Sequence, residues 1–172
     1  MHERYGAAVT WLPFDLHPEY PPEGHPRTEL HRRLGPNVDD HMREVFARSG
    51  LEWNPPDVIP NSRKALRVGE LARDEGVHGA FHDRAMDAHW AECADIGDDE
   101  VLRGLAREVG LAADAVDRVL ASDEYAERVA VSTQQAASIG ITGIPAFLLD
   151  DRLLVVGAQP RDVFEQAFDR LG

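Results

Sequence analysis

Residues 140–159 constrain the fold of this chain more than any other stretch. They hold a helix-stopping glycine, an Ile-Pro step at Ile144–Pro145, and two short apolar segments around an Asp-Asp-Arg turn. The apolar segments, 146–149 and 153–156, predict a β-hairpin, because turn residues between two short apolar runs favour this connection. An X-Pro bond prefers the trans form by only about 0.5–1 kcal/mol, so Pro145 is a candidate for a cis proline at the entrance to the hairpin.

Composition limits the classes of function. The chain has 172 residues, which suits one domain with a sizeable core. Its 18 Lys+Arg against 31 Asp+Glu give a net charge of -13, which argues against binding to nucleic acid or to an anionic membrane surface. No run approaches the ~20 apolar residues of a membrane span, and the first residues lack a signal-peptide pattern. With Cys93 as its single cysteine the chain cannot form an internal disulfide, so we expect a reducing compartment, the cytoplasm.

The remaining patterns predict a mixed order of strands and helices. Residues 7–16, with Val9 and Trp11, are typical of a strand. Residues 17–26 hold four prolines and a glycine and predict a stiff, extended connector. From residue 28 to residue 139 we expect helices with no further strand. A last helix follows Pro160, which suits a first helical position.

The helices of the middle section are predicted from caps, glycine stops and apolar periodicity. Asn61 or Ser62 caps one helix, and Asp98 caps another, which has further acidic residues in its first turn. The predicted spans are 28–34, 39–49, 62–75, 77–93, 98–110, 114–121 and 123–139.

Four motifs in order along the chain resemble one family. They are Trp-Leu-Pro-Phe-Asp-Leu-His-Pro from Trp11 with Pro-Pro-Glu-Gly at 21–24, Pro-Asn-Ser-Arg-Lys-Ala from Pro60, Asp-Ile-Gly-Asp from Asp95, and Gly-Ile-Thr-Gly-Ile-Pro-Ala-Phe from Gly140 with Val-Gly-Ala-Gln-Pro at 156–160. Together they resemble the DsbA-like thioredoxin-fold proteins, in the branch that holds FrnE-type oxidoreductases and 2-hydroxychromene-2-carboxylate isomerases. The resemblance spans nearly the whole chain.

This resemblance implies an α/β, thioredoxin-like fold with a large all-helical insertion at 28–121 inside one domain, 1–172. Family members begin with a strand, followed by a Cys-x-x-Cys motif, or a serine equivalent, at the start of a helix. The present chain opens at what resembles the end of that helix, so the first strand and the motif are missing from it. We therefore expect Met1 to be an internal methionine preceded by roughly 20 to 30 further residues, the length of one strand plus a helix of ordinary length.

The resemblance also implies where a substrate would bind. A cysteine at a helix N-terminus has a lowered pKa and attacks disulfides at neutral pH. Gly143, Ile144 and Pro145 would lie opposite it, with the backbone of Ile144 offered to an extended substrate segment. In the alternative reading, Pro145 only shapes the hairpin. Asn61 would lie near the cleft and help to hold glutathione or substrate, or else it merely caps its helix.

Other chemistry-bearing residues receive no catalytic or metal role. Three histidines precede Cys93 at spacings of four, seven and four, which places them on one helix face: His78, His82 and His89. No flanking carboxylate or second histidine helix completes a ligand set, so we predict no metal site. Cys93 is expected to be an inert, partly buried thiol, and the three tryptophans are expected in the core.

Three functions follow from these observations. The first is a DsbA-family thiol-disulfide oxidoreductase that acts on protein or small-molecule disulfides without a cofactor. The second is an isomerase or transferase of the same fold that depends on glutathione. The third is a non-catalytic module that binds peptides at its proline loop. Since the chain holds no catalytic nucleophile, we expect the 172-residue form to be inactive in thiol chemistry.

Overall fold

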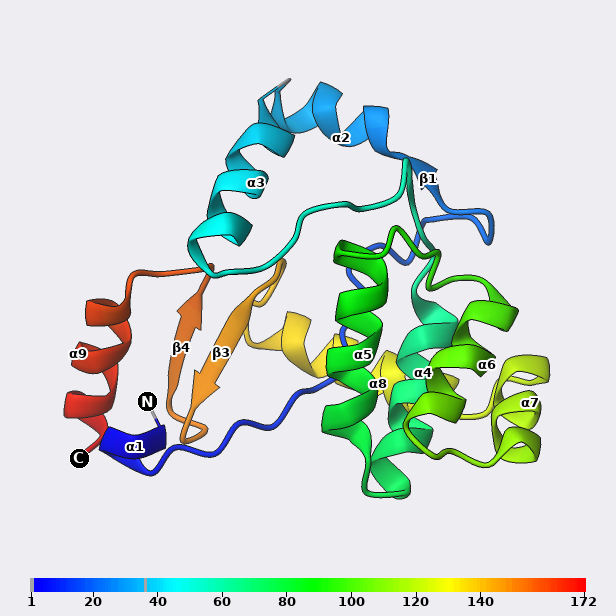
Figure 1. The fold of residues 1–172 in the computed structure, drawn as a ribbon. Helices are drawn as coiled ribbons and strands as arrows, with labels where there is room; N and C mark the ends of the chain where they lie inside the picture. Colours follow the sequence, from blue (N-terminus) through cyan, green and yellow to red (C-terminus); the bar gives the residue numbers. More distant parts are fainter. Residues whose placement is uncertain (1, 36) are drawn as a thin grey trace.

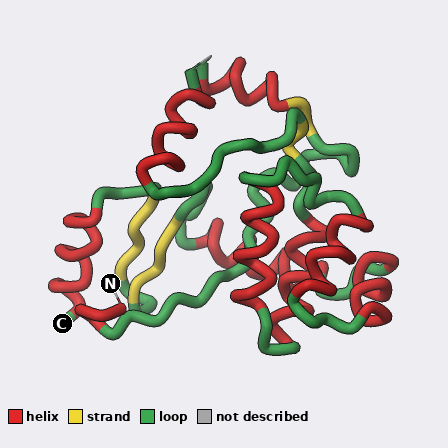
Figure 2. Tube along the Cα trace, in the orientation of Figure 1, coloured by secondary structure: helices red, strands yellow, loops and turns green. Residues whose placement is uncertain are grey.

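The computed structural model of the protein describes residues 2–35 and 37–172 (Figure 1). A helical half, α4–α8, lies beside a hairpin half made of β3, β4 and α9, and helices α2 and α3 arch above both (Figure 1). Figure 2 shows how little of the chain is strand. The elements are α1 His2–Tyr5, β1 His25–Pro26, α2 Arg27–Leu34, α3 Val38–Arg48, β2 Val58–Ile59, α4 Arg63–Asp74, α5 His78–Trp90, α6 Asp99–Glu108, α7 Ala113–Ala121, α8 Ala126–Ser138, β3 Ala146–Leu149, β4 Leu153–Val156 and α9 Arg161–Leu171.

The hydrophobic core lies in the helical half, around α4. Helices α5, α6, α7 and α8 all pack against α4. The largest of the almost completely buried side chains in this half are Val68, Leu102, Val116 and Val119. Each contributes about 1.5–3 kcal/mol by its removal from water. The segment from α4 to α7 therefore holds a core of its own.

Local signals set the helix ends in this half. The side chain of Asp98 accepts hydrogen bonds from the backbone N–H groups of Glu100 (2.9 Å) and Val101 (3.0 Å), which otherwise lack helical partners. Gly110, with φ of +85°, ends the same helix. Both signals were predicted from the sequence, and most helix bounds fall within a few residues of the expected ones. Helix α8 starts at Ala126 and not at residue 123, because Tyr125 has a left-handed backbone (φ +67°).

The predicted β-hairpin is confirmed. Strands β3 and β4 are antiparallel, with Ala146 opposite Val156 and Leu149 opposite Leu153. Asp150 and Asp151 both have φ of +51°, a turn conformation that aspartate tolerates better than most residues. One face of the hairpin packs on α9 through an edge-on contact between Phe147 and Phe164, with ring centroids 4.9 Å apart. On the other face Leu148 and Val156 stay 45% and 48% exposed.

The predicted strand at residues 7–16 is wrong. This segment is extended, but it has no strand neighbour among the described residues. Val9 and Leu12 are 74% and 72% exposed, and Trp11, expected in the core, is 48% exposed. A sequence with high β-propensity forms a strand only when a neighbour satisfies its backbone groups. The segment is held instead by single contacts, including a 3.0 Å hydrogen bond from the Asp15 N–H to the hydroxyl of Thr133 in α8.

A second correction concerns the expectation of no strand between residues 28 and 139. Strand β2 (Val58–Ile59) lies in that section and pairs antiparallel with β1 (His25–Pro26), where a loop and a connector were predicted. Gly24 makes this approach possible, because a Cβ there would lie 2.5 Å from the carbonyl oxygen of Ile59. Two-residue strands are too short to show alternation in a sequence. The expected division into one domain with an insertion at 28–121 stays a prediction.

Candidate functional site

The loop between α8 and β3 holds three of the predicted site residues, Gly143, Ile144 and Pro145. Gly140, with φ of +89°, ends α8. The next residue, Ile141, stays attached to the helix, because its side chain is buried and its N–H donates to the Ala136 carbonyl (3.0 Å). The Ile144–Pro145 peptide bond is cis. Around Gly143 the structure leaves open space, because a Cβ built there meets nothing within 4 Å.

Ile144 is an exposed apolar residue of this loop. Its side chain is 61% exposed. The carbonyl of the next residue, Pro145, accepts a hydrogen bond from Gly157 (2.8 Å), which continues the hairpin ladder by one pair. No partner for the N–H or C=O of Ile144 occurs within the described residues. An exposed residue with free backbone groups next to a strand edge is suited to pair with an added strand.

Strand β3 continues this accessible edge. It pairs with β4 on one side, and no described residue forms a ladder with its other side. In Figure 1 β4 lies toward α9 and β3 toward the helical half. Since Pro145 and Gly157 form a hydrogen-bonded pair, the antiparallel alternation directs the N–H groups of Phe147 and Leu149 to β4. The N–H groups of Ala146 and Leu148 then point to the open edge.

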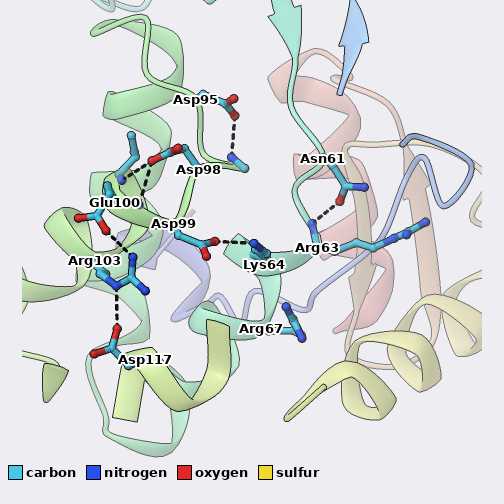
Figure 3. Close-up of polar contacts among 12 residues, drawn as sticks. Asn61, Arg63, Lys64, Arg67, Asp95, Asp98, Asp99, Glu100, Arg103 and Asp117 are labelled. Carbon is cyan, nitrogen blue, oxygen red and sulfur yellow. Dashed lines mark hydrogen bonds and ion pairs between the residues drawn. The ribbon is translucent and has the colours of Figure 1, made fainter. Parts of the chain in front are cut away.

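Asn61 is an internal anchor. Its amide nitrogen donates to the carbonyls of Tyr20 (2.9 Å) and Pro21 (3.3 Å), and its amide oxygen accepts from the N–H of Arg63 (3.1 Å), the first residue of α4 (Figure 3). The Asn61 side chain thus binds both the start of α4 and the proline-rich connector. Among the described residues, none of its hydrogen bonds reaches Gly143, Ile144 or Pro145.

The sequence contains a signal for this anchor that the sequence interpretation missed. Prolines have no N–H group, so a proline-rich connector has few backbone donors of its own and its carbonyls need donors from elsewhere. A side-chain amide at the start of a following helix can supply them.

The motif that begins at Pro60 also packs against the motif that begins at Asp95. Gly97 is held by a 2.8 Å hydrogen bond to Asp95, and a Cβ at Gly97 would lie 3.1 Å from the carbonyl oxygen of Asn61 (Figure 3).

Charged groups surround the start of α4. Arg63 donates to the Asp15 carboxylate (2.9 Å) and to the Pro18 carbonyl, which ties the connector and residues 7–16 to the helical half. Lys64 pairs with Asp99 at the start of α6 (Figure 3). These pairs are half-exposed and add little stability individually. They fix the relative positions of three family motifs.

The histidine-rich face of α5 is partly buried. Burial lowers the pKa of His78, His82 and His89, and His89 packs edge-on against Trp90. No group of three or more candidate ligand side chains comes together within the part of the chain that the structure describes. The expected partial burial of Cys93 is wrong. This thiol is exposed, because the residue lies beyond the end of α5 in a left-handed backbone conformation (φ +59°).

The family follows from comparison with known proteins. A profile described as the DSBA-like thioredoxin domain matches residues 1–169. The chain belongs to this family. Its fold is accordingly the DsbA-like thioredoxin fold, rich in helices and with few strands, and the predicted α/β, thioredoxin-like class is confirmed.

Individual relatives agree with this assignment. The chain is 27% identical over 162 residues to the uncharacterized protein YwbO of Bacillus subtilis (strain 168), covering 92% of this chain and 80% of YwbO. It is similar to the structure of a probable DsbA oxidoreductase from Streptomyces coelicolor, with a TM-score of 0.88, 31% identity, and coverage of 98% of this chain and 76% of that one. A 2-hydroxychromene-2-carboxylate isomerase shares the fold at a TM-score of 0.80 and 19% identity, with 99% and 84% covered.

Helices long and apolar enough to cross a bilayer are absent from the described residues.

Proposed function

We propose that this protein is a DsbA-like thiol-disulfide oxidoreductase in which Gly143, Ile144 and Pro145 hold an extended segment of the substrate. The observation that carries the proposal is the exposed Ile144, with free backbone groups, at the end of the open edge of β3. The family and its oxidoreductase-like relatives support it. Its partners are protein or small-molecule disulfides, it needs no bound cofactor, and a cytoplasmic location remains our prediction.

The chemistry requires a thiolate that this chain does not supply at the loop. In disulfide exchange, a thiolate attacks one sulfur of the substrate disulfide, forms a mixed disulfide, and releases the other sulfur as a thiolate. A second cysteine then attacks the mixed disulfide and frees the reduced substrate. Cys93 is a single cysteine beyond the end of α5, so it cannot complete this cycle alone.

We assign the reactive motif to a segment outside the 172 residues. Two backbone segments in this structure lack a ladder partner among the described residues, namely β3 on its open side and residues 8–16. An added strand would satisfy such groups. In this proposal that strand leads into the Cys-x-x-Cys motif and positions it opposite Ile144.

The decisive experiment compares two lengths of the protein. The coding sequence upstream of Met1 is read and, where the frame stays open, the longer protein is expressed beside the 172-residue chain. We expect the upstream frame to encode a strand followed by Cys-x-x-Cys, and the longer protein to reduce insulin disulfides while the shorter one does not. Turnover by the 172-residue chain, or an upstream frame without cysteines, would contradict the proposal.

The glutathione-dependent isomerase is the second candidate, because a 2-hydroxychromene-2-carboxylate isomerase has the same fold. It would require a serine in place of the first cysteine of the motif. It would also need Asn61 to contact glutathione, whereas its amide is engaged by Tyr20, Pro21 and Arg63. An upstream serine at that position, together with glutathione binding that is lost on Asn61→Ala, would favour this function.

A stable chain that binds peptides without any exchange activity in either length would favour a non-catalytic module.

A further inference from the structure

Residues 7–16 are fastened to the helical half at Trp11. The indole ring stacks on the ring of His82 in α5, with centroids 4.4 Å apart and planes inclined by 23°. The carbonyl oxygen of Trp11 accepts a hydrogen bond from Nη2 of Arg73 in α4. We call this group, Trp11 with Arg73, His78 and His82, the Trp11 clasp. It holds a segment that has no strand neighbour among the described residues.

Arg73 is the centre of the clasp. Its Nε donates to Glu70 (3.1 Å), a carboxylate whose side chain is only 3% exposed. Its Nη2 lies 3.1 Å from Nε2 of His78, besides its contact with the Trp11 carbonyl. A guanidinium group only donates hydrogen bonds, so Nε2 of His78 must accept. The clasp therefore requires a neutral His78 that carries its proton on Nδ1.

We propose that the Trp11 clasp is a pH-sensitive set of contacts that releases the segment around Trp11 when His78 and His82 become protonated. When Nε2 of His78 is protonated, two hydrogen-bond donors, both positively charged, face each other at 3.1 Å: Nε2 of His78 and Nη2 of Arg73. Arg73 then turns away from His78, and the hydrogen bond to the Trp11 carbonyl is lost with it. A charge on His82 next to His78, whose ring centroid lies 6.1 Å away, adds to the repulsion. This device does not depend on the function proposed above.

The nearby carboxylates only partly offset the causes that disfavour protonation of His78 and His82. Glu70 faces His78 from α4, but it is already shared between Arg73 and Arg128 of α8, with the latter at 3.3 Å. Arg128 is in turn held by Asp74, and Asp83 lies beside His82 on α5. Burial is the main cause that lowers the pKa of His78, followed by Arg73 and His82, while Glu70 opposes it. Burial likewise lowers the pKa of His82, against Asp83.

The sign of the pH effect follows from these directions. Both histidines have a pKa below the ordinary value of 6.5 when the clasp is closed. The open segment binds protons more readily than the closed one, so the clasp is fully stable above the ordinary value. As the pH falls below it, the ratio of open to closed clasp rises, approaching about tenfold per pH unit for each histidine that titrates. The rise ends at the lowered pKa of the closed form.

Fluorine NMR on the 172-residue chain labelled with 5-fluorotryptophan tests the clasp. The chain has three tryptophans, and Trp11→Phe assigns the signal of Trp11. Between pH 7.5 and pH 5 we expect this signal to move toward the position of a solvent-exposed tryptophan. The signal of Trp53, whose ring stacks on that of Trp90 with centroids 5.0 Å apart, should stay in place, and the far-UV circular dichroism should not change.

Paired variants separate the titration from a general acid effect. The double variant His78→Gln, His82→Phe keeps an acceptor for Arg73 and a ring for Trp11, but neither side chain titrates. It should reduce the pH-dependent shift of Trp11 several-fold, whereas His41→Gln, an exposed histidine on α3, should leave the shift unchanged. A Trp11 signal that stays constant down to pH 5 would overturn the proposal. The same holds for an undiminished shift in the double variant, or for simultaneous movement of all three signals with loss of helix.

Discussion

The helical half and the hairpin half of this molecule differ in how they are held together. Around α4, side chains such as Val68 and Leu102 are completely buried, and the helices satisfy their own backbone groups. In the hairpin half, Ile144, Leu148 and Val156 are 45–61% exposed, and β3 has one open edge among the described residues. Helices carry their hydrogen bonds within a local segment, whereas a strand needs a neighbour from elsewhere in the chain. The candidate site therefore lies in the half in which a strand edge has no hydrogen-bonding strand beside it among the described residues.

The largest effect should come from the core of the helical half. Leu102→Ala removes a fully buried side chain and leaves a cavity, so we expect the free energy of unfolding to fall by about 2–5 kcal/mol. Leu148→Ala makes the same chemical change on the exposed face of the hairpin and should cost roughly 0.5–1 kcal/mol. Urea unfolding followed by circular dichroism measures both. Equal losses would show that the two halves do not differ in packing.

A smaller effect is expected at the buried carboxylate that joins α4 to α8. Glu70→Gln removes the negative charge between Arg73 and Arg128 and should destabilise the protein by about 1–3 kcal/mol, since both guanidinium groups lose a charged partner. Glu44→Gln is the matched control, because Glu44 pairs with Arg48 on the exposed surface of α3. The thermal midpoint of each variant provides the comparison. If Glu44→Gln destabilises the protein as much as Glu70→Gln, burial of the Glu70 carboxylate does not add to its effect on stability.

The smallest effect tests the local signals that end the helices. Asp98→Ala removes two capping hydrogen bonds and should cost about 1 kcal/mol. Asn37 stands at the corresponding position of α3 without a side-chain capping bond, so Asn37→Ala should change the unfolding free energy by a few tenths of a kcal/mol at most. Chemical denaturation of the two variants side by side tests the difference. If the order is reversed, the cap at Asp98 does not stabilise α6.

The same contrast explains what could be predicted from the sequence. The helix capped by Asp98 and the hairpin around Asp150 and Asp151 were predicted because their signals lie within a few residues of the elements they shape. The strand at residues 7–16 was predicted wrongly, since its sequence favours a strand but no described neighbour pairs with it. The pair of β1 and β2 was missed because two residues give no pattern.

The candidate site shows a similar division. The accessible loop at Ile144 follows from the Ile-Pro step and the turn of the hairpin. The engagement of Asn61 by the connector could not be read from its own motif, because the carbonyls that it serves lie about forty residues earlier, at Tyr20 and Pro21. Contacts of that separation depend on how distant segments of the chain pack, and the local pattern around Asn61 does not record them. The clasp at Trp11 is a contact of the same kind.

Amide hydrogen exchange in the hairpin tests the central claim, an open edge on β3 beside Ile144, most directly. In the 172-residue chain, the N–H groups of Phe147 and Leu149 point to β4 and should be protected, while those of Ala146 and Leu148 point to the open edge and should exchange about tenfold faster or more. Site-resolved exchange by NMR distinguishes the two sets. Equal protection of all four amides would contradict the account, since it would mean that both edges of β3 are already paired.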